Sequence, residues 1–208
     1  MNTLSTIYLI GGGEIHKGET ASIDADIKKS ARPGSVFTFF PTAAYDSEGY
    51  IKRITEVYGN DFKIINPTVA QGAQFAIDAI KQASVIYLGG GVTKELMDRF
   101  SDLKLVEHLF DALDRGVVIV GISAGALALS EYYIHEEDDG TLELKKGWGI
   151  IPACTMVHAK QNIFEKAVAE FKSALPANLP FNGIPECLAL KYEGAKVSVV
   201  GVGEVWSV

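Results

Sequence analysis

The chain has 208 residues, of which 48% are hydrophobic and 22% are charged, and its formal net charge is −7. A chain of this length buries roughly 70% of its unfolded surface when it folds as one unit, so we expect a single domain over residues 1–208. The acidic balance offers no extended basic surface, which argues against nucleic acid or an anionic membrane as a main partner. Small peptides or other small molecules suit this composition better.

The start of the chain carries no targeting signal that we can identify. Residues 1–6 lack the basic start and apolar core of a signal peptide, and no apolar run approaches the roughly 20 residues that span a bilayer. Cys154 and Cys187 lack the paired spacing of a zinc site or a redox motif. We therefore expect a cytoplasmic protein with two reduced thiols and with neither a metal nor a cofactor; a homodimer is left open.

Five short runs rich in β-branched and aromatic residues alternate with amphipathic segments. Such runs are typical of strands that are buried on both faces of a sheet. They lie at residues 6–10, 35–40, 62–65, 84–88 and 117–121. Strands that alternate with helices need right-handed crossovers, which favours a doubly wound α/β fold with a mostly parallel sheet flanked by helices. In such a fold, ligands bind at the carboxyl ends of the strands.

The clearest helical pattern runs from Lys94 to Arg115 and stops at Gly116. Its apolar residues recur every three or four positions, which predicts one long helix. Residues 161–174 predict another helix. The chain is then expected to close with an antiparallel pair of strands over residues 188–192 and 196–202, with a turn at Glu193 and Gly194.

A first glycine cluster, Gly11 to Gly13, follows the first predicted strand. It invites comparison with a phosphate-binding loop, but Glu19 stands where such a loop needs lysine, and a carboxylate repels phosphate. We interpret the cluster as a tight turn at the active edge of the sheet. Gly12, Glu14 and His16 are then candidates to line a pocket there.

The segment Gly121-Ile122-Ser123-Ala124-Gly125 matches the G-x-S-x-G nucleophile elbow. It lies where the motif requires, between a buried strand and a run of small residues that begins a helix. A sharp turn there would lift the Ser123 hydroxyl clear of the sheet and bring the Ala124 amide close to a developing oxyanion. The alternative is that Ser123 is only the N-cap of a helix in a tight turn.

A third cluster, Gly89 to Gly91, ends the preceding predicted strand. In a parallel sheet the tip of that strand can lie beside the elbow. The lack of a side chain at Gly90 or Gly91 would let the backbone approach a substrate carbonyl closely, as a second oxyanion donor must. A plain turn is the alternative.

A serine nucleophile needs a base. The chain offers four histidines: His16, His108, His135 and His158. His108 lies within the long amphipathic pattern, His16 lies on a different loop, and His135 belongs to an acidic turn. His158 follows an extended segment at 149–157 and is the best candidate. The acidic turn at 136–139 is the expected source of a carboxylate that orients the imidazole, although four acidic residues in a row leave the choice open.

Three segments taken together resemble peptidase family S51, which contains aspartyl dipeptidases and cyanophycinases. They are Leu88–Thr93, Gly121–Ala126 and Gly147–Pro152, the last leading to His158. The resemblance extends from the first strand to Gly183-Ile184-Pro185-Glu186. It implies a flavodoxin-like fold similar to that of class I glutamine amidotransferases, with serine in place of their nucleophilic cysteine.

The resemblance also implies roles for individual residues. Ser123 matches the family nucleophile, His158 the base, and Gly90 and Ala124 the amides of the oxyanion hole. For the acidic member, ungapped alignment from Ser123 favours Asp138 over its alternatives. Those alternatives are Glu137 and Asp139.

The resulting hypothesis is a serine hydrolase that cleaves a small peptide or isopeptide bond through an acyl-enzyme. The chain has no arginine after Arg115, so that region lacks a bidentate carboxylate clamp, and we do not expect Asp-X dipeptidase activity specifically. Lys160 could attract a carboxylate as a point charge, and Gly91 could also line the pocket. The alternative hypothesis is a non-catalytic or amidotransferase-like module that binds a small metabolite. An α/β-hydrolase fold is disfavoured because only 35 residues lead from Ser123 to His158.

Overall fold

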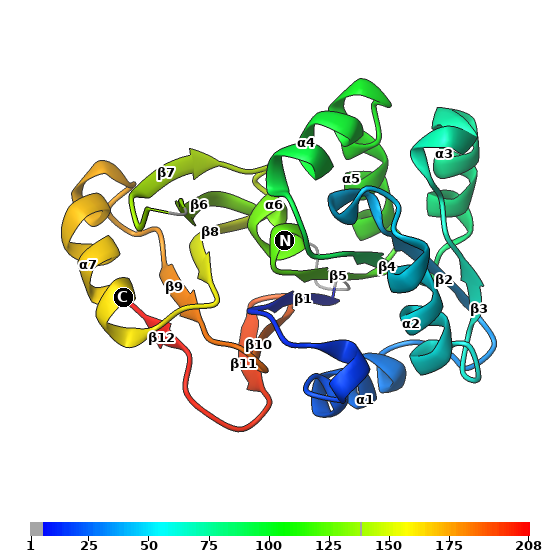
Figure 1. Ribbon diagram of the computed structural model, residues 1–208, viewed down its shortest axis with the longest axis horizontal. Coiled ribbons are helices and arrows are strands. Elements are labelled where there is room, and N and C mark those ends of the chain that lie inside the picture. The colour runs from blue at the N-terminus through cyan, green and yellow to red at the C-terminus, as the bar shows by residue number, and fades with distance from the viewer. Residues whose placement is uncertain (1–5, 138) are drawn as a thin grey trace.

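A seven-stranded sheet forms the centre of the computed structural model, which describes residues 6–137 and 139–208 (Figure 1). Its strands are β1 (Thr6–Ile10), β2 (Val36–Phe40), β3 (Lys63–Ile65), β4 (Val85–Leu88), β5 (Val118–Ile122), β10 (Ala189–Glu193) and β11 (Lys196–Val200). The strand order is β11-β10-β1-β5-β4-β2-β3. The five strands from β1 to β3 in this order are parallel, whereas β10 and β11 add an antiparallel pair at one edge. Both the parallel sheet and the closing hairpin are therefore as predicted.

Helices cover both faces of this sheet. They are α1 (Ala21–Lys29), α2 (Glu48–Tyr58), α3 (Gly72–Gln82), α4 (Thr93–Asp102), α5 (Val106–Asp114) and α6 (Ala124–Leu129). Helices α1 and α2 pack on one face through residues such as Ile23 and Tyr58, while α3 to α6 pack on the other through residues such as Phe100 and Leu109. Side chains alternate between two faces along a strand, so β1, β2, β4, β5 and β10 each contribute to both cores. The doubly wound α/β architecture is confirmed.

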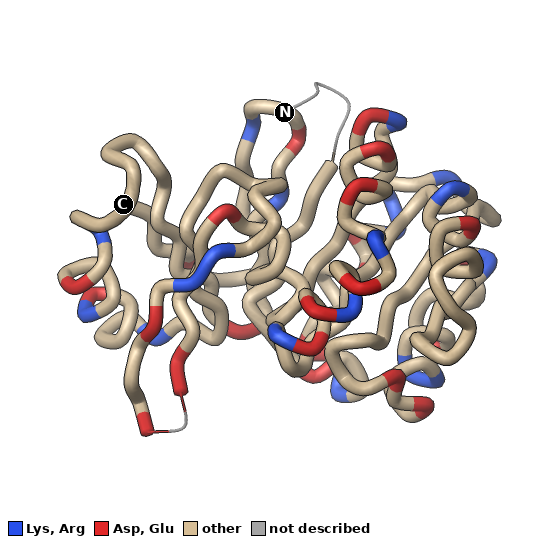
Figure 2. The backbone as a smooth tube through the Cα atoms, turned by 90° about the horizontal axis from the view of Figure 1, so that it is seen from above, with Lys and Arg blue, Asp and Glu red and all other residues tan. Residues whose placement is uncertain are grey.

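Most charged residues lie on the outside of this arrangement, and Asp24 is a buried exception. Figure 2 shows Lys, Arg, Asp and Glu interspersed along the helices, whereas β1, β4 and β5 contain none of these residues. Strands buried on both faces favour continuous apolar runs because neither face meets water. Among the described residues, every helix is too short or too polar to traverse a lipid bilayer.

The expectation of one helix from Lys94 to Arg115 is wrong. The chain instead forms α4 and α5, separated by a turn in which Lys104 adopts a left-handed conformation with φ of 54°. Both helices bury their apolar sides in the same core, so the apolar period continues across the break. With neither glycine nor proline at the turn, the sequence pattern did not reveal it.

A second sheet of five strands lies beside the first, and the sequence analysis anticipated only one of its segments, the one before His158. Its strands are β6 (Ser130–Glu136), β7 (Leu142–Lys146), β8 (Ile151–Val157), β9 (Phe181–Ile184) and β12 (Trp206–Ser207). Their order is β12-β9-β8-β6-β7, with β6, β8 and β9 parallel. Helix α7 (Gln161–Phe171) packs on this sheet through Phe164, whose ring lies 5.5 Å from that of Phe181, centroid to centroid.

Four short 3₁₀ turns complete the described structure. They are η1 (Ile15–Lys17), η2 (Thr42–Ala44), η3 (Val69–Gln71) and η4 (Lys172–Ala174). The last one continues α7, so the predicted helical segment at 161–174 consists of an α-helix followed by a 3₁₀ turn. The single domain over residues 1–208 stays a prediction.

Candidate active site

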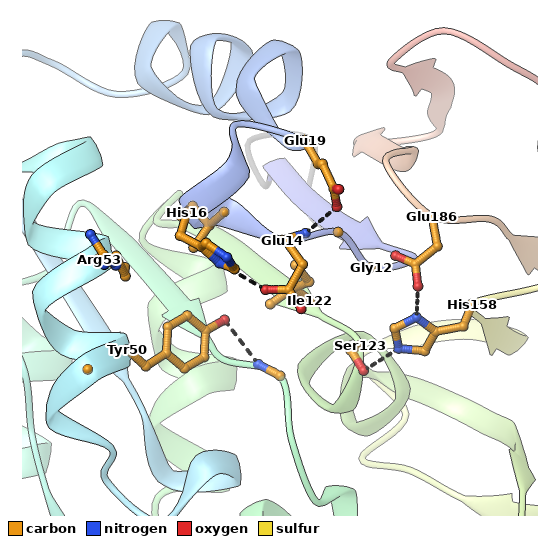
Figure 3. A pocket seen from close by; sticks show the side chains of 14 residues that line it. Gly12, Glu14, His16, Glu19, Tyr50, Arg53, Ile122, Ser123, His158 and Glu186 are labelled. Atoms are coloured by element: carbon orange, nitrogen blue, oxygen red, sulfur yellow. Dashed lines mark hydrogen bonds and ion pairs between the residues drawn. The ribbon is translucent and has the colours of Figure 1, made fainter.

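The three glycine clusters meet at one edge of the seven-stranded sheet. Strands β1, β5 and β4 are neighbours and parallel, so the loops that follow them emerge side by side. A backbone hydrogen bond of 2.9 Å from the Ser123 amide to the Ile10 carbonyl joins the loop that follows β5 to the end of β1. This edge is where a doubly wound fold places its ligands, and Figure 3 shows the side chains that gather there.

Ser123 stands on a strained turn. Its φ of 50° and ψ of −111° are unusual for a residue with a side chain, and its hydroxyl makes no capping hydrogen bond to α6. A Cβ on Gly121 would lie 2.5 Å from the Gly125 carbonyl, and one on Gly125 would lie 2.3 Å from the Leu88 carbonyl oxygen. The turn can therefore form only with glycine at both positions, as a nucleophile elbow requires.

His158 lies within hydrogen-bond distance of Ser123. The two residues meet with Oγ 2.8 Å from Nε2, a separation suited to proton transfer between them. His158 follows β8 directly, and its own amide donates to the Gly11 carbonyl at 2.9 Å. The second sheet thus supplies the imidazole, and the first glycine cluster fixes the backbone that carries it.

Glu186 occupies the other side of the imidazole ring. Its Oε1 lies 2.5 Å from Nδ1 of His158. Strands β8 and β9 are parallel with Val157 opposite Ile184, so the residues that follow them emerge together. Gly12 leaves room for the pair, because a Cβ there would lie 2.2 Å from Oε2 of Glu186 and 2.5 Å from Nδ1 of His158.

The structure therefore corrects the expected source of the carboxylate. Glu137 pairs with Lys145 at 3.4 Å and with His135 at 3.5 Å, and Asp139 accepts from the Thr141 amide at 2.9 Å. Asp138 lies outside the described residues. Among those that are described, the carboxylate bonded to His158 is Glu186. The sequence analysis searched near Ser123 in sequence, whereas strand pairing brings Glu186, 28 positions beyond His158, to the imidazole ring.

The predicted oxyanion donors flank Ser123. A Cβ on Gly90 would lie 3.3 Å from Cβ of Ser123, so this loop passes directly beside the nucleophile. Ala124 is the first residue of α6, and its amide therefore has no partner within the helix. The Gly90 amide does have a partner: it donates to the hydroxyl of Tyr50 at 3.3 Å.

Two cavities meet at Ser123 and His158, which line both. The larger has a volume of about 600 Å³ and is also lined by Gly12 and Glu14. The smaller, of about 360 Å³, is lined by Gly91, by apolar residues of α6, β6 and β8, and by polar residues that include His135, Glu136 and Glu137. Lys160 is exposed and lines neither cavity.

The larger cavity carries charges of both signs, with an acidic excess. Glu14 forms an ion pair of 3.0 Å with His16, and its amide donates to Glu19 at 2.8 Å. Among the described residues, the arginine or lysine side chain that lines this cavity is Arg53, on α2. It also forms an ion pair of 2.7 Å with Glu56. The sequence analysis anticipated Glu14 and His16 but did not identify Arg53. An amphipathic helix gives no sequence signal of which polar residue faces a neighbouring loop.

Neither cysteine of the chain lines either cavity. Cys154 and Cys187 are both free, and burial raises the pKa of Cys154 to about 12, which keeps it as a neutral thiol. Within residues 6–137 and 139–208, no group of three His, Cys, Asp or Glu side chains is arranged to hold a metal ion.

Comparisons with known proteins concern the sequence and the fold of the chain. The sequence model of Peptidase family S51 matches residues 7–200. The chain is 29% identical over 159 residues to the uncharacterized peptidase YgaJ of Bacillus subtilis (strain 168), an overlap of 73% of this chain and 67% of that protein. Among solved structures, a putative peptidase E protein from Listeria monocytogenes EGD-e has a TM-score of 0.72 at 16% identity, covering 96% of this chain and 99% of that one. A peptidase from an acI-B1 Actinobacterium has a TM-score of 0.65 at 23% identity, with coverages of 97% and 89%.

Proposed function

The chain belongs to peptidase family S51, and on that premise we propose that it hydrolyses a small peptide or isopeptide bond with Ser123 as the nucleophile. The observation that carries the proposal is the continuous chain of hydrogen bonds from Ser123 through His158 to Glu186. A nucleophile, a base and a group that orients the base are the three parts that serine acyl transfer requires.

The reaction begins when the Ser123 hydroxyl attacks the carbonyl carbon of the scissile bond. Nε2 of His158 accepts the hydroxyl proton as the new C–O bond forms, and the carbonyl oxygen becomes an oxyanion. The protonated imidazole then gives this proton to the leaving amine, the C–N bond breaks, and an ester on Ser123 remains. Water, deprotonated by the same imidazole, releases the acid product and regenerates the hydroxyl.

In this reaction the Glu186 carboxylate accepts a hydrogen bond from Nδ1–H of His158. Its carboxylate fixes the tautomer in which Nε2 is free to accept a proton, and it stabilises the imidazolium that forms during attack. The side chains of His158 and Glu186 are 47% and 53% exposed, so water reaches the pair without any rearrangement. An accessible base of this kind suits the hydrolysis step that follows acylation.

The two cavities supply space on both sides of the reacting bond. Because they share Ser123 and His158 and otherwise have different linings, the acyl portion and the leaving portion of a substrate would occupy one cavity each. Volumes of about 600 and 360 Å³ accommodate residues of a short peptide. This arrangement supports a small peptide or isopeptide as the substrate.

A panel of dipeptides and β-linked isopeptides, assayed by the release of a new amine, tests the proposal. We expect turnover by the wild-type protein and a loss of at least about 10⁴-fold in Ser123→Ala, because no other group replaces the nucleophile. Ser101→Ala, which changes an exposed serine on α4, is the matched control and should keep the wild-type rate. If Ser123→Ala binds peptides but the wild type turns none over, the chain is a binding module rather than a hydrolase.

A further inference from the structure

Three consecutive backbone carbonyls, at the end of β1 and in the loop after it, each accept a hydrogen bond from a different segment of the candidate site. The pairs, donor first, are Ser123 to Ile10 at 2.9 Å, His158 to Gly11 at 2.9 Å and Cys187 to Gly12 at 3.1 Å. Cys187 directly follows Glu186 in the chain. Residues 10–12 therefore hold the backbone of the nucleophile, of the base and of the residue next to the carboxylate, although these segments follow three different strands.

Gly11 and Gly12 differ in what a side chain would meet. A Cβ on Gly11 would overlap the backbone carbonyl oxygen of Pro185, which cannot move unless the chain itself shifts. A Cβ on Gly12 would instead overlap Oε2 of Glu186 and lie 2.5 Å from Nδ1 of His158. Both of these side chains are about half exposed, so they can turn away into solvent. A side chain at position 12 would therefore displace the reacting groups and leave the surrounding backbone in place.

The displaced groups would be the base and its carboxylate. Oε1 of Glu186 bonds Nδ1 of His158, and Figure 3 shows Gly12 beside this pair. The atoms nearest to the added Cβ belong to Glu186 and His158, whereas Ser123 lies on the Nε2 side of the ring. Position 12 thus faces the bond that orients the imidazole, and glycine leaves this bond undisturbed.

We propose that residues 10–12 position the three reacting groups, and that Gly12 is a positioning residue because its lack of a side chain lets Glu186 reach Nδ1 of His158. The inference rests on the proposed function, since it concerns the same proton transfers. Gly12 acts only through this pair, whose bond fixes the tautomer in which Nε2 accepts the Ser123 proton. The first glycine cluster thereby has a role that a tight turn alone would not require.

The alternative is that Gly12 is needed only for its backbone conformation. Its φ of 152° lies in a range that residues with a side chain rarely adopt. In that case alanine would lower the stability of the fold and leave the bond between His158 and Glu186 unchanged. Gly34 separates the two explanations, because its φ of 77° is also positive but a Cβ there would meet nothing within 4 Å. It precedes β2, at the edge of the sheet opposite the candidate site.

The rate of covalent labelling by a fluorophosphonate probe reports on activation of Ser123 without knowledge of the natural substrate. We expect folded Gly12→Ala to be labelled about 100-fold more slowly than wild type, because the imidazole loses its orienting carboxylate. Gly34→Ala is the matched control and should keep the wild-type labelling rate. Urea denaturation of each variant measures what the positive φ costs in stability at the two positions.

A double-mutant cycle tests whether Gly12 acts through Glu186. If Gly12→Ala separates the carboxylate from the imidazole, it removes the same interaction as Glu186→Gln, and the two losses do not multiply. We expect Gly12→Ala to slow labelling by less than about tenfold when it is introduced into Glu186→Gln. Losses that multiply in full would show that Gly12 acts on another part of the site and would overturn the proposal.

The proton on Nδ1 of His158 provides a measurement that a loss of stability alone would not change. A proton bonded between an imidazole and a carboxylate resonates far downfield in the NMR spectrum. We expect this signal in wild type and in Gly34→Ala, and we expect it to be lost in Gly12→Ala. An unaltered signal or a wild-type labelling rate in folded Gly12→Ala would contradict the proposal.

The remaining outcomes are read from the folding of Gly12→Ala and from the labelling of wild type. A Gly12→Ala protein that does not fold would also overturn the proposal, because the side chains of His158 and Glu186 are expected to turn away while the backbone stays. If the folded wild type is not labelled, the proposed function fails and this inference fails with it. A labelled wild type with an unaffected Gly12→Ala overturns only the role of Gly12.

Discussion

Nδ1 of His158 lies 2.5 Å from Oε1 of Glu186, although 28 residues separate them in the chain. They meet because they follow β8 and β9, which are parallel neighbours in the second sheet. Ser123, by contrast, follows β5 of the first sheet. The candidate site is therefore assembled where the two sheets adjoin, and its nucleophile and its base come from different sheets.

Replacing Glu186 by glutamine should sharply reduce the rate while preserving the fold. Glutamine keeps the shape but removes the charge that stabilises the imidazolium, and it can hold the ring in the wrong tautomer. We expect kcat to fall by about 10² to 10⁴ with little change in KM. Steady-state kinetics on an active peptide provides the measurement. Asp139→Asn, which alters the acidic turn at a residue that lines neither cavity, should remain near wild type; the reverse pattern would return the acidic role to that turn.

Gly125 should tolerate no side chain. In Gly125→Ala the new Cβ would meet the Leu88 carbonyl oxygen at 2.3 Å, and this backbone atom cannot move without disturbing β4. We expect the free energy of unfolding to fall by about 1–3 kcal/mol or more. Urea denaturation provides the value. Gly49→Ala is the control, because its Cβ meets nothing closer than 3.8 Å, and it should be neutral or slightly stabilising in a helix.

Peptides with a free α-amine should be better substrates than the same peptides after N-acetylation. Glu14 and Glu19 line the larger cavity with Glu186, against the single arginine Arg53, so the cavity favours a cation. A charge-assisted hydrogen bond to an ammonium group contributes about 1.5–3 kcal/mol, which corresponds to roughly tenfold or more in kcat/KM.

The measurement is kcat/KM for each peptide in its free and in its N-acetylated form. In Glu14→Gln the ratio of these two values should be closer to one than in the wild type. Glu165→Gln, at an exposed acidic residue of α7 that lines neither cavity, serves as the control and should keep the wild-type preference. Acetylated peptides that react as well as free ones would refute an amine-binding role for this cavity.

Ionisation of the Asp24 carboxyl should lower the free energy of unfolding as pH rises. Burial raises the pKa of this carboxyl above its ordinary value of 3.8, despite hydrogen bonds from Tyr58 and Thr20. The folded state therefore holds the Asp24 proton more tightly than the unfolded state does. This contribution to the free energy of unfolding is fully present below the unfolded pKa, and it is lost as pH rises through the folded pKa.

Urea unfolding of wild type and Asp24→Asn between pH 4 and pH 7 isolates this effect. The stability of wild type relative to Asp24→Asn should decrease across the interval, because asparagine does not titrate. A relative stability that instead grows with pH would mean that the hydrogen bonds from Tyr58 and Thr20 outweigh the burial.

Local patterns sufficed to predict the central sheet with its flanking helices, and two members of the candidate site. Continuous apolar runs identified the strands of the central sheet. The glycines around Ser123 identified the elbow, because the tight turn requires them at fixed positions within five consecutive residues. His158 was found because it follows an extended segment directly. These features depend on near neighbours in the chain, which is why a single sequence carries them.

Features that depend on strand pairing were not predictable in the same way. Glu186 is held in place by the register of β8 and β9, and β9 is a short strand between prolines that gave no periodic signal. Tyr50 likewise reaches Gly90 through the packing of α2, across 40 residues of sequence. An acidic residue directly after a short buried run, as at Ile184-Pro185-Glu186, was the one local indication available.

The most direct measurement of the central claim is the location of a fluorophosphonate adduct by peptide mass spectrometry, in wild type and in His158→Ala. The account predicts one adduct on Ser123 in the folded protein, no adduct after unfolding in urea, and labelling of His158→Ala slower by about 10⁴-fold. A folded wild-type protein that carries no adduct, or carries it on another residue, would contradict the account.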